Sequence, residues 1–138
     1  ELEVYDIKND ATSSINDKWT LVFFVESECN QSCEDKLYQV RQIRLALGKD
    51  RDQVDRLLVS GKIQSWEVFS DSFNGQKYID PRSKSYAELV KKFEEYPKFD
   101  TRGTYLVDPF GFLMMKYKFD ANPMGTIKDI ERLIKNQK

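Results

Sequence analysis

Two cysteines, Cys29 and Cys33, are the residues of this 138-residue chain best suited to chemistry. They are its only cysteines, they stand four residues apart, and the chain contains no histidine. A close thiol pair forms a disulfide, exchanges it with other thiols, or binds a soft ion such as Cu(I) through thiolates. The missing histidine excludes Ser-His and Cys-His nucleophile pairs, an imidazole general base and zinc sites with nitrogen ligands. Any metal site must therefore use sulfur and oxygen ligands.

The spacing of the pair decides where Cys29 must lie if a disulfide is to form. Residues four apart on a helix have Cβ atoms about 5 to 6 Å apart, whereas a disulfide needs about 3.5 to 4.5 Å. Ser32 and Asp35 have capping-box spacing, which predicts a helix from about Cys33 to Leu47 and leaves Cys29 in the preceding loop. Both a disulfide and Cu(I) binding are then possible. The alternative is a structural disulfide or two buried thiols, although so short a loop constrains the unfolded chain little.

Acidic residues surround the pair in the sequence: Glu26, Glu28, Glu34 and Asp35. Nearby anions disfavour a thiolate, whereas a helix N-terminus stabilises one. No Lys or Arg stands close to the cysteines before Lys36. We therefore expect thiols less acidic than those of a strong oxidant and a rim suited to a cation, unless Glu34 and Asp35 merely complement the helix dipole.

Hydrophobic patterns place the cysteines between a strand and a helix. Residues 19–25, "WTLVFFV", form an uninterrupted apolar run typical of a strand buried on both faces. Periodicity and turn residues predict a strand at 56–60, a helix at 85–96, a hairpin at 103–119 around Asp108-Pro109-Phe110-Gly111, and a C-terminal helix with Ile127, Ile130, Leu133 and Ile134. This order resembles the thioredoxin-like α/β fold, in which helices flank a central mixed β-sheet.

Length and composition indicate one domain spanning residues 1–138. We expect residues 1–18 to be an N-terminal extension or a trimmed linker. The long loop at 63–84 is either a binding feature or a pair of short strands. The chain has 22 Lys and Arg against 23 Asp and Glu, so no strong field favours binding to nucleic acid or an anionic membrane.

The sequence has neither a window of about 20 apolar residues nor the pattern of a signal peptide. It does not begin with Met. One interpretation is a mature or trimmed domain whose targeting segment or anchor has been removed.

Three stretches together resemble the Sco (SenC) proteins: "WTLVFF", the CxxxC pair, and the hairpin "YLVDPFG", within a similarity that spans roughly residues 18 to 135. The resemblance implies a thioredoxin-like protein that helps to assemble the copper centre of cytochrome oxidase. It also implies a location outside the cytoplasm (periplasmic), with a membrane tether in the full-length protein. The implied partner is a cytochrome oxidase copper subunit or a copper chaperone.

In that family, two cysteines and a distant histidine bind copper. The resemblance implies copper-ligand and redox roles for Cys29 and Cys33. The histidine falls shortly before "YLVDP", where this chain has Asp100 and Thr101, so we expect a divergent branch that lacks the distal histidine. Asn30 and Glu34 stand where the family commonly has prolines.

Other residues offer a third copper ligand. Asp100 provides oxygen, which matches Cu(I) poorly, and Met114, Met115 and Met124 provide softer thioethers. Met114 and Met115 are adjacent in an expected strand, so they point to opposite faces and at least one is expected in the core.

Three functions are compatible with these features. The favoured one is a Sco-like assembly factor that binds Cu(I) or reduces a recipient's cysteines through Cys29 and Cys33. The second is a metal-free thiol-disulfide oxidoreductase in which Cys29 attacks and Cys33 resolves. The third is a non-catalytic binding module that docks through residues 71–82. A peroxidase assisted by Arg102 is a weaker alternative.

Overall fold

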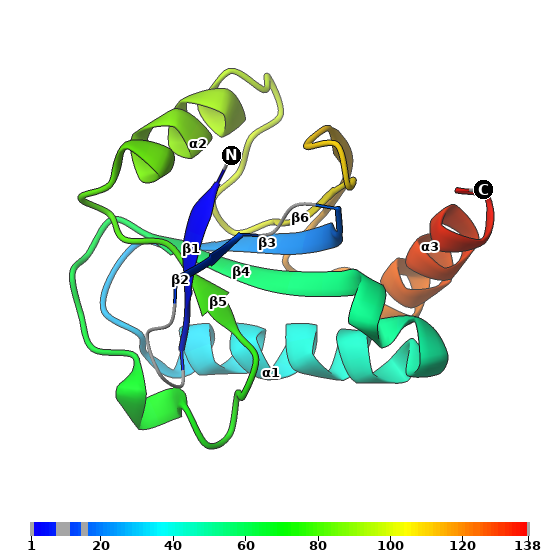
Figure 1. The fold of residues 1–138 in the computed structure, drawn as a ribbon, viewed down its shortest axis with the longest axis horizontal. Helices are drawn as coiled ribbons and strands as arrows, with labels where there is room; N and C mark the ends of the chain where they lie inside the picture. The colour runs from blue at the N-terminus through cyan, green and yellow to red at the C-terminus, as the bar shows by residue number, and fades with distance from the viewer. Residues whose placement is uncertain (1, 8–11, 15–16, 138) are drawn as a thin grey trace.

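The computed structural model describes residues 2–7, 12–14 and 17–137, which form a seven-stranded mixed sheet with helices on both faces (Figure 1). The described helices are α1 (Gln31–Ala46), α2 (Lys84–Glu94) and α3 (Pro123–Lys135). The strands are β1 (Glu3–Asp6), β2 (Thr12–Ser14), β3 (Trp19–Val25), β4 (Val54–Ser60), β5 (Lys77–Tyr78), β6 (Thr104–Val107) and β7 (Leu113–Tyr117). Their order across the sheet is β2-β1-β5-β4-β3-β6-β7. The predicted thioredoxin-like architecture is confirmed.

Strand β3 lies in the middle of the sheet, as its sequence predicts. It pairs in parallel with β4 and antiparallel with β6. Its side chains alternate between two cores, so that Leu21 and Phe23 face α1 and α3 whereas Val22 faces α2. All three side chains are almost completely buried. Each such burial stabilises the fold by about 1.5 to 3 kcal/mol, so β3 provides a rigid base for the loop that follows it.

The helices cover the two faces of the sheet unequally. Helices α1 and α3 pack on one face (Figure 1). On this face Ile43 of α1 belongs to the same buried cluster as Ile130 and Ile134 of α3. Helix α2 covers the other face, where the ring of Phe93 packs against the ring of Tyr105 of β6. Each helix presents one apolar stripe, which accounts for its place in the fold.

The helical and hairpin predictions are confirmed, with one error at the start of α1. The hairpin closes as expected, because Gly111 N–H donates to the carbonyl of Asp108 and β6 pairs antiparallel with β7. Helix α1, however, begins at Gln31, and its N-cap is Asn30 rather than Ser32. The Asn30 side chain accepts from the backbone N–H of Cys33, which is one of the first-turn N–H groups that have no partner within the helix.

The N-terminal segment contributes to the sheet. Residues 3–6, which we expected to lie in an extension or linker, form β1 and pair with β5. Val4 is completely buried, and the ring of Tyr5 stacks on that of Tyr78 at 5.7 Å. The parts of that expectation that concern residues 1, 8–11 and 15–16 lie outside the described residues.

The 63–84 loop is largely built into the domain. It contains the short 3₁₀ helix Glu67–Phe69 and strand β5, rather than a pair of strands. Its side chains Trp66, Phe73 and Ile79 are buried.

In the part of the chain that the structure describes, no helix is long and apolar enough to cross a membrane.

One buried cation stands out on β4. The side chain of Arg56 is 2% exposed, and its Nη2 donates to the carbonyl of Asn74 at 2.7 Å. Its Nε and Nη1 have no hydrogen-bond partner among the described residues. Burial, with Arg44 and Arg41 nearby, lowers the pKa of Arg56 to about 10. This side chain therefore destabilises the charged folded state at neutral pH.

A candidate redox site at the Cys29–Cys33 disulfide

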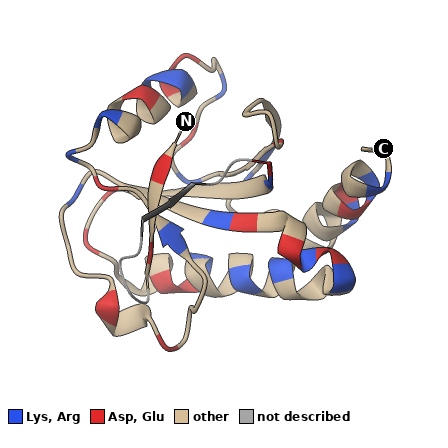
Figure 2. Cartoon of the chain, viewed as in Figure 1, with Lys and Arg blue, Asp and Glu red and all other residues tan. Residues whose placement is uncertain are grey.

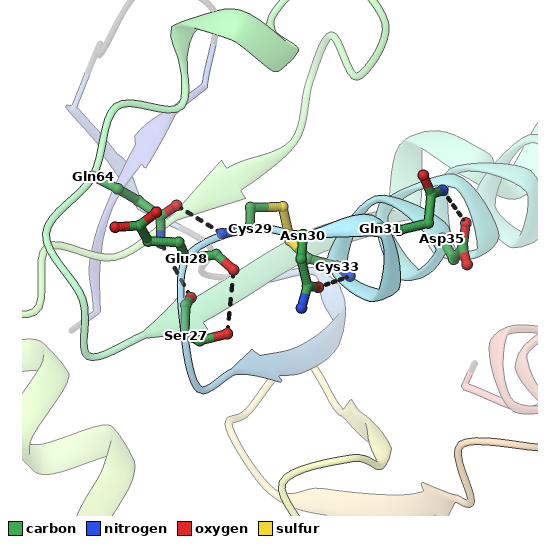
Figure 3. The surroundings of a disulfide bond; sticks show 8 residues. All are labelled: Ser27, Glu28, Cys29, Asn30, Gln31, Cys33, Asp35 and Gln64. Carbon is green, nitrogen blue, oxygen red and sulfur yellow. Dashed lines mark hydrogen bonds between the residues drawn. A yellow bond between two sulfur atoms is a disulfide. The ribbon is translucent and has the colours of Figure 1, made fainter.

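The two cysteines form a disulfide at the junction between β3 and α1 (Figure 3). Cys29 lies in the loop that follows β3, and Cys33 lies in the first turn of α1. Their Cα atoms are 5.1 Å apart. The sequence-based condition for a disulfide, that Cys29 precedes the helix, is therefore met.

The two sulfur-bearing residues differ in accessibility. Cys33 is 4% exposed and packs into the core between α1 and the sheet with Leu37 and Phe23. Cys29 is only partly buried and packs against the edge of the same cluster. A thiolate from outside therefore reaches Cys29 more readily than Cys33.

Asn30 fixes the orientation of Cys33. The Asn30 Oδ1 atom accepts from the Cys33 N–H at 3.1 Å, and the Asn30 carbonyl accepts from the Glu34 N–H at 3.0 Å. Both bonds belong to the N-terminus of α1, where the partial positive charge of the helix stabilises an anion by about 0.3 to 1 kcal/mol. A thiolate on Cys33 lies within reach of this effect.

A segment distant in sequence holds the loop that carries Cys29. The Gln64 Oε1 atom accepts from the Cys29 N–H at 3.0 Å, and its Nε2 donates to the Ser27 carbonyl at 3.4 Å (Figure 3). Lys62 forms an exposed ion pair with Glu28 at 3.6 Å. The segment after β4 thus contacts the cysteine loop at three successive residues.

The acidic residues around the pair are largely engaged with neighbours. Glu26 accepts from the hydroxyl of Thr101, Glu28 pairs with Lys62, and Asp35 accepts from Gln31 at 2.8 Å. Figure 2 shows the acidic residues of α1 at its N-terminal end and basic residues further along. The charges on α1 therefore complement its dipole.

A cleft of about 360 Å³ adjoins the disulfide on the Cys33 side. Its lining includes Cys33, Lys36, Thr101, Arg102 and Phe119, so the fold brings residues 101–102 close to the first turn of α1. Burial lowers the pKa of Lys36, whose ammonium donates to the hydroxyl of Thr104 at 3.0 Å. The guanidinium of Arg102 lies over the ring of Phe119 at 4.6 Å.

Asp100 lies beside this cleft and is engaged elsewhere. Its Oδ1 atom accepts from the backbone N–H of Arg102 at 2.9 Å and pairs with the Arg102 Nε at 3.5 Å. The backbone hydrogen bond lowers the pKa of Asp100 below its usual range. Within the described ranges, no three Cys, Asp or Glu side chains are grouped closely enough to hold a metal ion. A ligand role for Asp100 stays a prediction.

The methionines do not complete a site with the cysteines in the described structure. Met115 is partly buried and packs against the buried cluster between the sheet and α3, whereas Met114 is 43% exposed, so Met115 is the one of the two on the core side of the strand. Met124 is exposed on α3. Among the described residues that line the cleft next to Cys33, there is no methionine.

Gln64 and Asn30 are the site residues that sequence reasoning missed. Gln64 stands 35 residues from Cys29, and no spacing rule connects them. Asn30 has a detectable signal, because Asn is among the preferred N-cap residues and stands three before Cys33.

Solved structures show the same fold. ScoI of Bradyrhizobium japonicum with copper bound is 22% identical with a TM-score of 0.71, and the match covers 95% of this chain and 96% of that chain. Yeast Sco1 with copper bound is 15% identical with a TM-score of 0.73, covering 98% and 87%. A SCO1/SenC family lipoprotein from Bacillus anthracis is 16% identical with a TM-score of 0.68, covering 97% and 95%. The predicted Sco-like fold is thereby confirmed.

Sequence comparisons give a family for most of the chain. No curated protein matches it. Residues 19–136, from the start of β3 to one residue beyond α3, match the family described as transmembrane-like, thioredoxin-like, C-terminal domain. The chain therefore belongs to this thioredoxin-like family.

Proposed function

We propose that this domain is a Sco-like thiol-disulfide protein whose Cys29–Cys33 pair cycles between a disulfide and a dithiol. The observation that carries the proposal is the unequal burial of the two bonded cysteines, with Cys29 accessible in a loop and Cys33 buried at the start of α1. This asymmetry suits an attacking residue and a resolving residue, respectively.

The exchange runs in two steps when the pair oxidises a partner. A partner thiolate attacks the Sγ atom of Cys29, the bond between Cys29 and Cys33 breaks, and its electron pair leaves on the Sγ atom of Cys33. The helix N-terminus stabilises the Cys33 thiolate. A second partner thiolate then attacks the partner's own sulfur in the mixed disulfide and releases Cys29. The partner dithiol loses two electrons and two protons, which the pair gains; the reverse sequence reduces a partner disulfide.

Cu(I) carriage is the second candidate, supported by the fold shared with copper-bound ScoI and yeast Sco1. Copper is here the cargo. The reduced pair provides two thiolates, which suit Cu(I). The described residues provide no third Cys, Asp or Glu grouped with them, so the residues fit two-coordinate binding. As a ligand, Asp100 would offer its Oδ2 atom, because Arg102 holds its Oδ1 atom.

The setting of this function is also a proposal. The Sco resemblance supports a cytochrome oxidase copper subunit or a copper chaperone as the protein partner. It further supports a site of action outside the cytoplasm, as in the periplasm, with a membrane tether in the full-length protein. The alternative is a docking role without chemistry, which the experiments below distinguish from thiol exchange and from copper carriage.

Two measurements test these candidates. The redox test incubates the protein in defined dithiothreitol buffers and counts free thiols by maleimide labelling. We expect one reversible two-electron transition in the folded protein. Cys33→Ser should trap a mixed disulfide through Cys29 with a small aromatic disulfide reagent, whereas Cys29→Ser, which leaves only the buried thiol, should react far more slowly. A pair that resists reduction until the protein unfolds refutes the exchange function.

The copper test titrates the reduced protein anaerobically against a chromophoric Cu(I) chelator. Binding of one Cu(I) that either Cys→Ser variant abolishes supports copper carriage. Copper that stays on the chelator excludes it. Partner binding that survives the double Cys→Ser variant indicates a docking module.

A further inference from the structure

The side chain of Gln64 bridges the backbone on both sides of Glu28. Its amide oxygen accepts from the Cys29 N–H and its amide nitrogen donates to the Ser27 carbonyl, so one side chain satisfies two polar groups of the loop (Figure 3). Gln64 itself stands on a segment that is fixed at both ends. Ser60, the last residue of β4, is 3% exposed, and Trp66 is 6% exposed in the core beneath the disulfide.

We propose that Gln64 is a positioning residue that sets the equilibrium between the disulfide and the dithiol of Cys29 and Cys33. This inference rests on the proposed exchange function. Gln64 touches the backbone of Cys29 and not the sulfur, so it acts by holding Cys29 in place.

The effect depends on what restrains Cys29 in each redox state. In the oxidised protein, the disulfide ties Cys29 to α1 in addition to the Gln64 bridge. In the reduced protein the covalent tie is gone, and the loop is held by packing, by Gln64, by the Lys62–Glu28 pair, and by hydrogen bonds at its two ends, from Thr101 to Glu26 and from the Cys33 N–H to Asn30. The Lys62–Glu28 pair has side chains 52% and 77% exposed, and such exposed pairs contribute only about 0 to 1 kcal/mol. Of these polar restraints, the Gln64 bridge is the one that acts on the backbone of Cys29 itself.

Restraining the dithiol favours the disulfide. A loop that already holds Cys29 near Cys33 loses less conformational entropy when the bond forms. Removing the bridge frees the loop mainly in the reduced state, so the dithiol gains entropy that the disulfide does not gain. The reduction potential then becomes less negative.

A purely structural role gives a different result. If Gln64 stabilises both redox states equally, its loss lowers the thermal stability of both forms by the same amount and leaves the disulfide equilibrium constant unchanged. The potential is thus the readout that separates positioning from general stability, because it reports only the difference between the two states.

The test uses Gln64→Met, which keeps the length of the side chain without its hydrogen bonds, and Gln64→Ala. The matched control is Gln53→Ala, because the Gln53 side-chain amide also donates a hydrogen bond, to Asp50 at 3.3 Å, at the end of β3 and β4 opposite the cysteine loop. For each protein the disulfide equilibrium constant is measured in dithiothreitol buffers, and thermal unfolding is recorded in both redox states.

We expect both Gln64 variants to lower the disulfide equilibrium constant by about threefold to tenfold, which is about 14 to 30 mV for a two-electron couple. The control should match the wild type. An unchanged constant in both Gln64 variants, or an equal change in Gln53→Ala, overturns the inference while the exchange function stands. If the wild-type pair is not reversibly reduced in the folded protein, the exchange function fails and this inference fails with it.

Discussion

Reducing the disulfide should cost the domain little stability. The bond joins residues separated by four positions, so it closes a loop of five residues. The chain-entropy relation gives about 2 kcal/mol for such a loop, compared with about 4.7 kcal/mol for a loop of 100 residues. Unfolding entropies of about 2.1 cal/mol/K per residue convert this loss to a decrease of about 7 °C in the midpoint of thermal unfolding.

The small loss follows from where the core lies. The buried clusters that join β3, β4 and α1 contain Leu21, Phe23 and Leu37, which are nearly or completely inaccessible to solvent and do not depend on the bond. Cys33 remains a small apolar side chain in that core when it is reduced. A redox pair that cycles has to leave the fold intact in both states, and this arrangement meets that requirement.

The assay follows thermal unfolding by circular dichroism with and without tris(2-carboxyethyl)phosphine. The double variant Cys29→Ser/Cys33→Ser should unfold near the temperature of the reduced wild type and should not respond to the reductant. A loss of about 5 kcal/mol or more, in the range seen when small domains lose a structural disulfide, would refute the reasoning. So would loss of the near-ultraviolet signal on reduction at 25 °C. Either result identifies the bond as a structural staple.

Further substitutions test the N-cap of α1, the buried Arg56 and the contact between β7 and α3. Asn30→Ala should lower the free energy of unfolding by about 1 kcal/mol because the N-cap of α1 is lost, whereas Ser32→Ala should change it by less than about 0.5 kcal/mol. Urea titration measures both values, and a larger loss for Ser32→Ala than for Asn30→Ala would identify Ser32 as the N-cap. Arg56→Met should raise the free energy of unfolding by about 1 to 3 kcal/mol at pH 7, because two buried unpaired donors are removed. The folded protein holds the Arg56 proton less tightly than the unfolded chain, so the free energy of unfolding of the wild type rises relative to that of Arg56→Met as the pH passes 10. A stability advantage of Arg56→Met that grows above pH 10 contradicts this. Tyr117→Phe should lower the free energy of unfolding by about 1.5 kcal/mol, because the hydroxyl donates to Asp129 of α3 at 2.9 Å; an additive loss on adding Asp129→Asn would show that the two side chains are not coupled.

Local patterns in the sequence were sufficient for most of the elements and for the site itself. The apolar run 19–25 predicted a central strand because a strand buried on both faces has no polar positions. The helical stripes predicted α2 and α3, and Asp108 to Gly111 predicted the hairpin turn, since turn chemistry depends on adjacent residues. The cysteine spacing required Cys29 to precede the helix if a disulfide was to form. Each of these inferences depends on residues within one or two helical turns.

The tertiary structure decided which distant segments meet, and local spacing carries no signal for that. Only pairing with β5 draws residues 3–6 into the sheet, and only the crossover after β4 brings Gln64 to Cys29. The side-by-side arrangement of β3 and β6 placed Thr101 and Arg102 beside the first turn of α1. These contacts form because the sheet brings together chain segments that are far apart in sequence, and they determine which groups surround the disulfide.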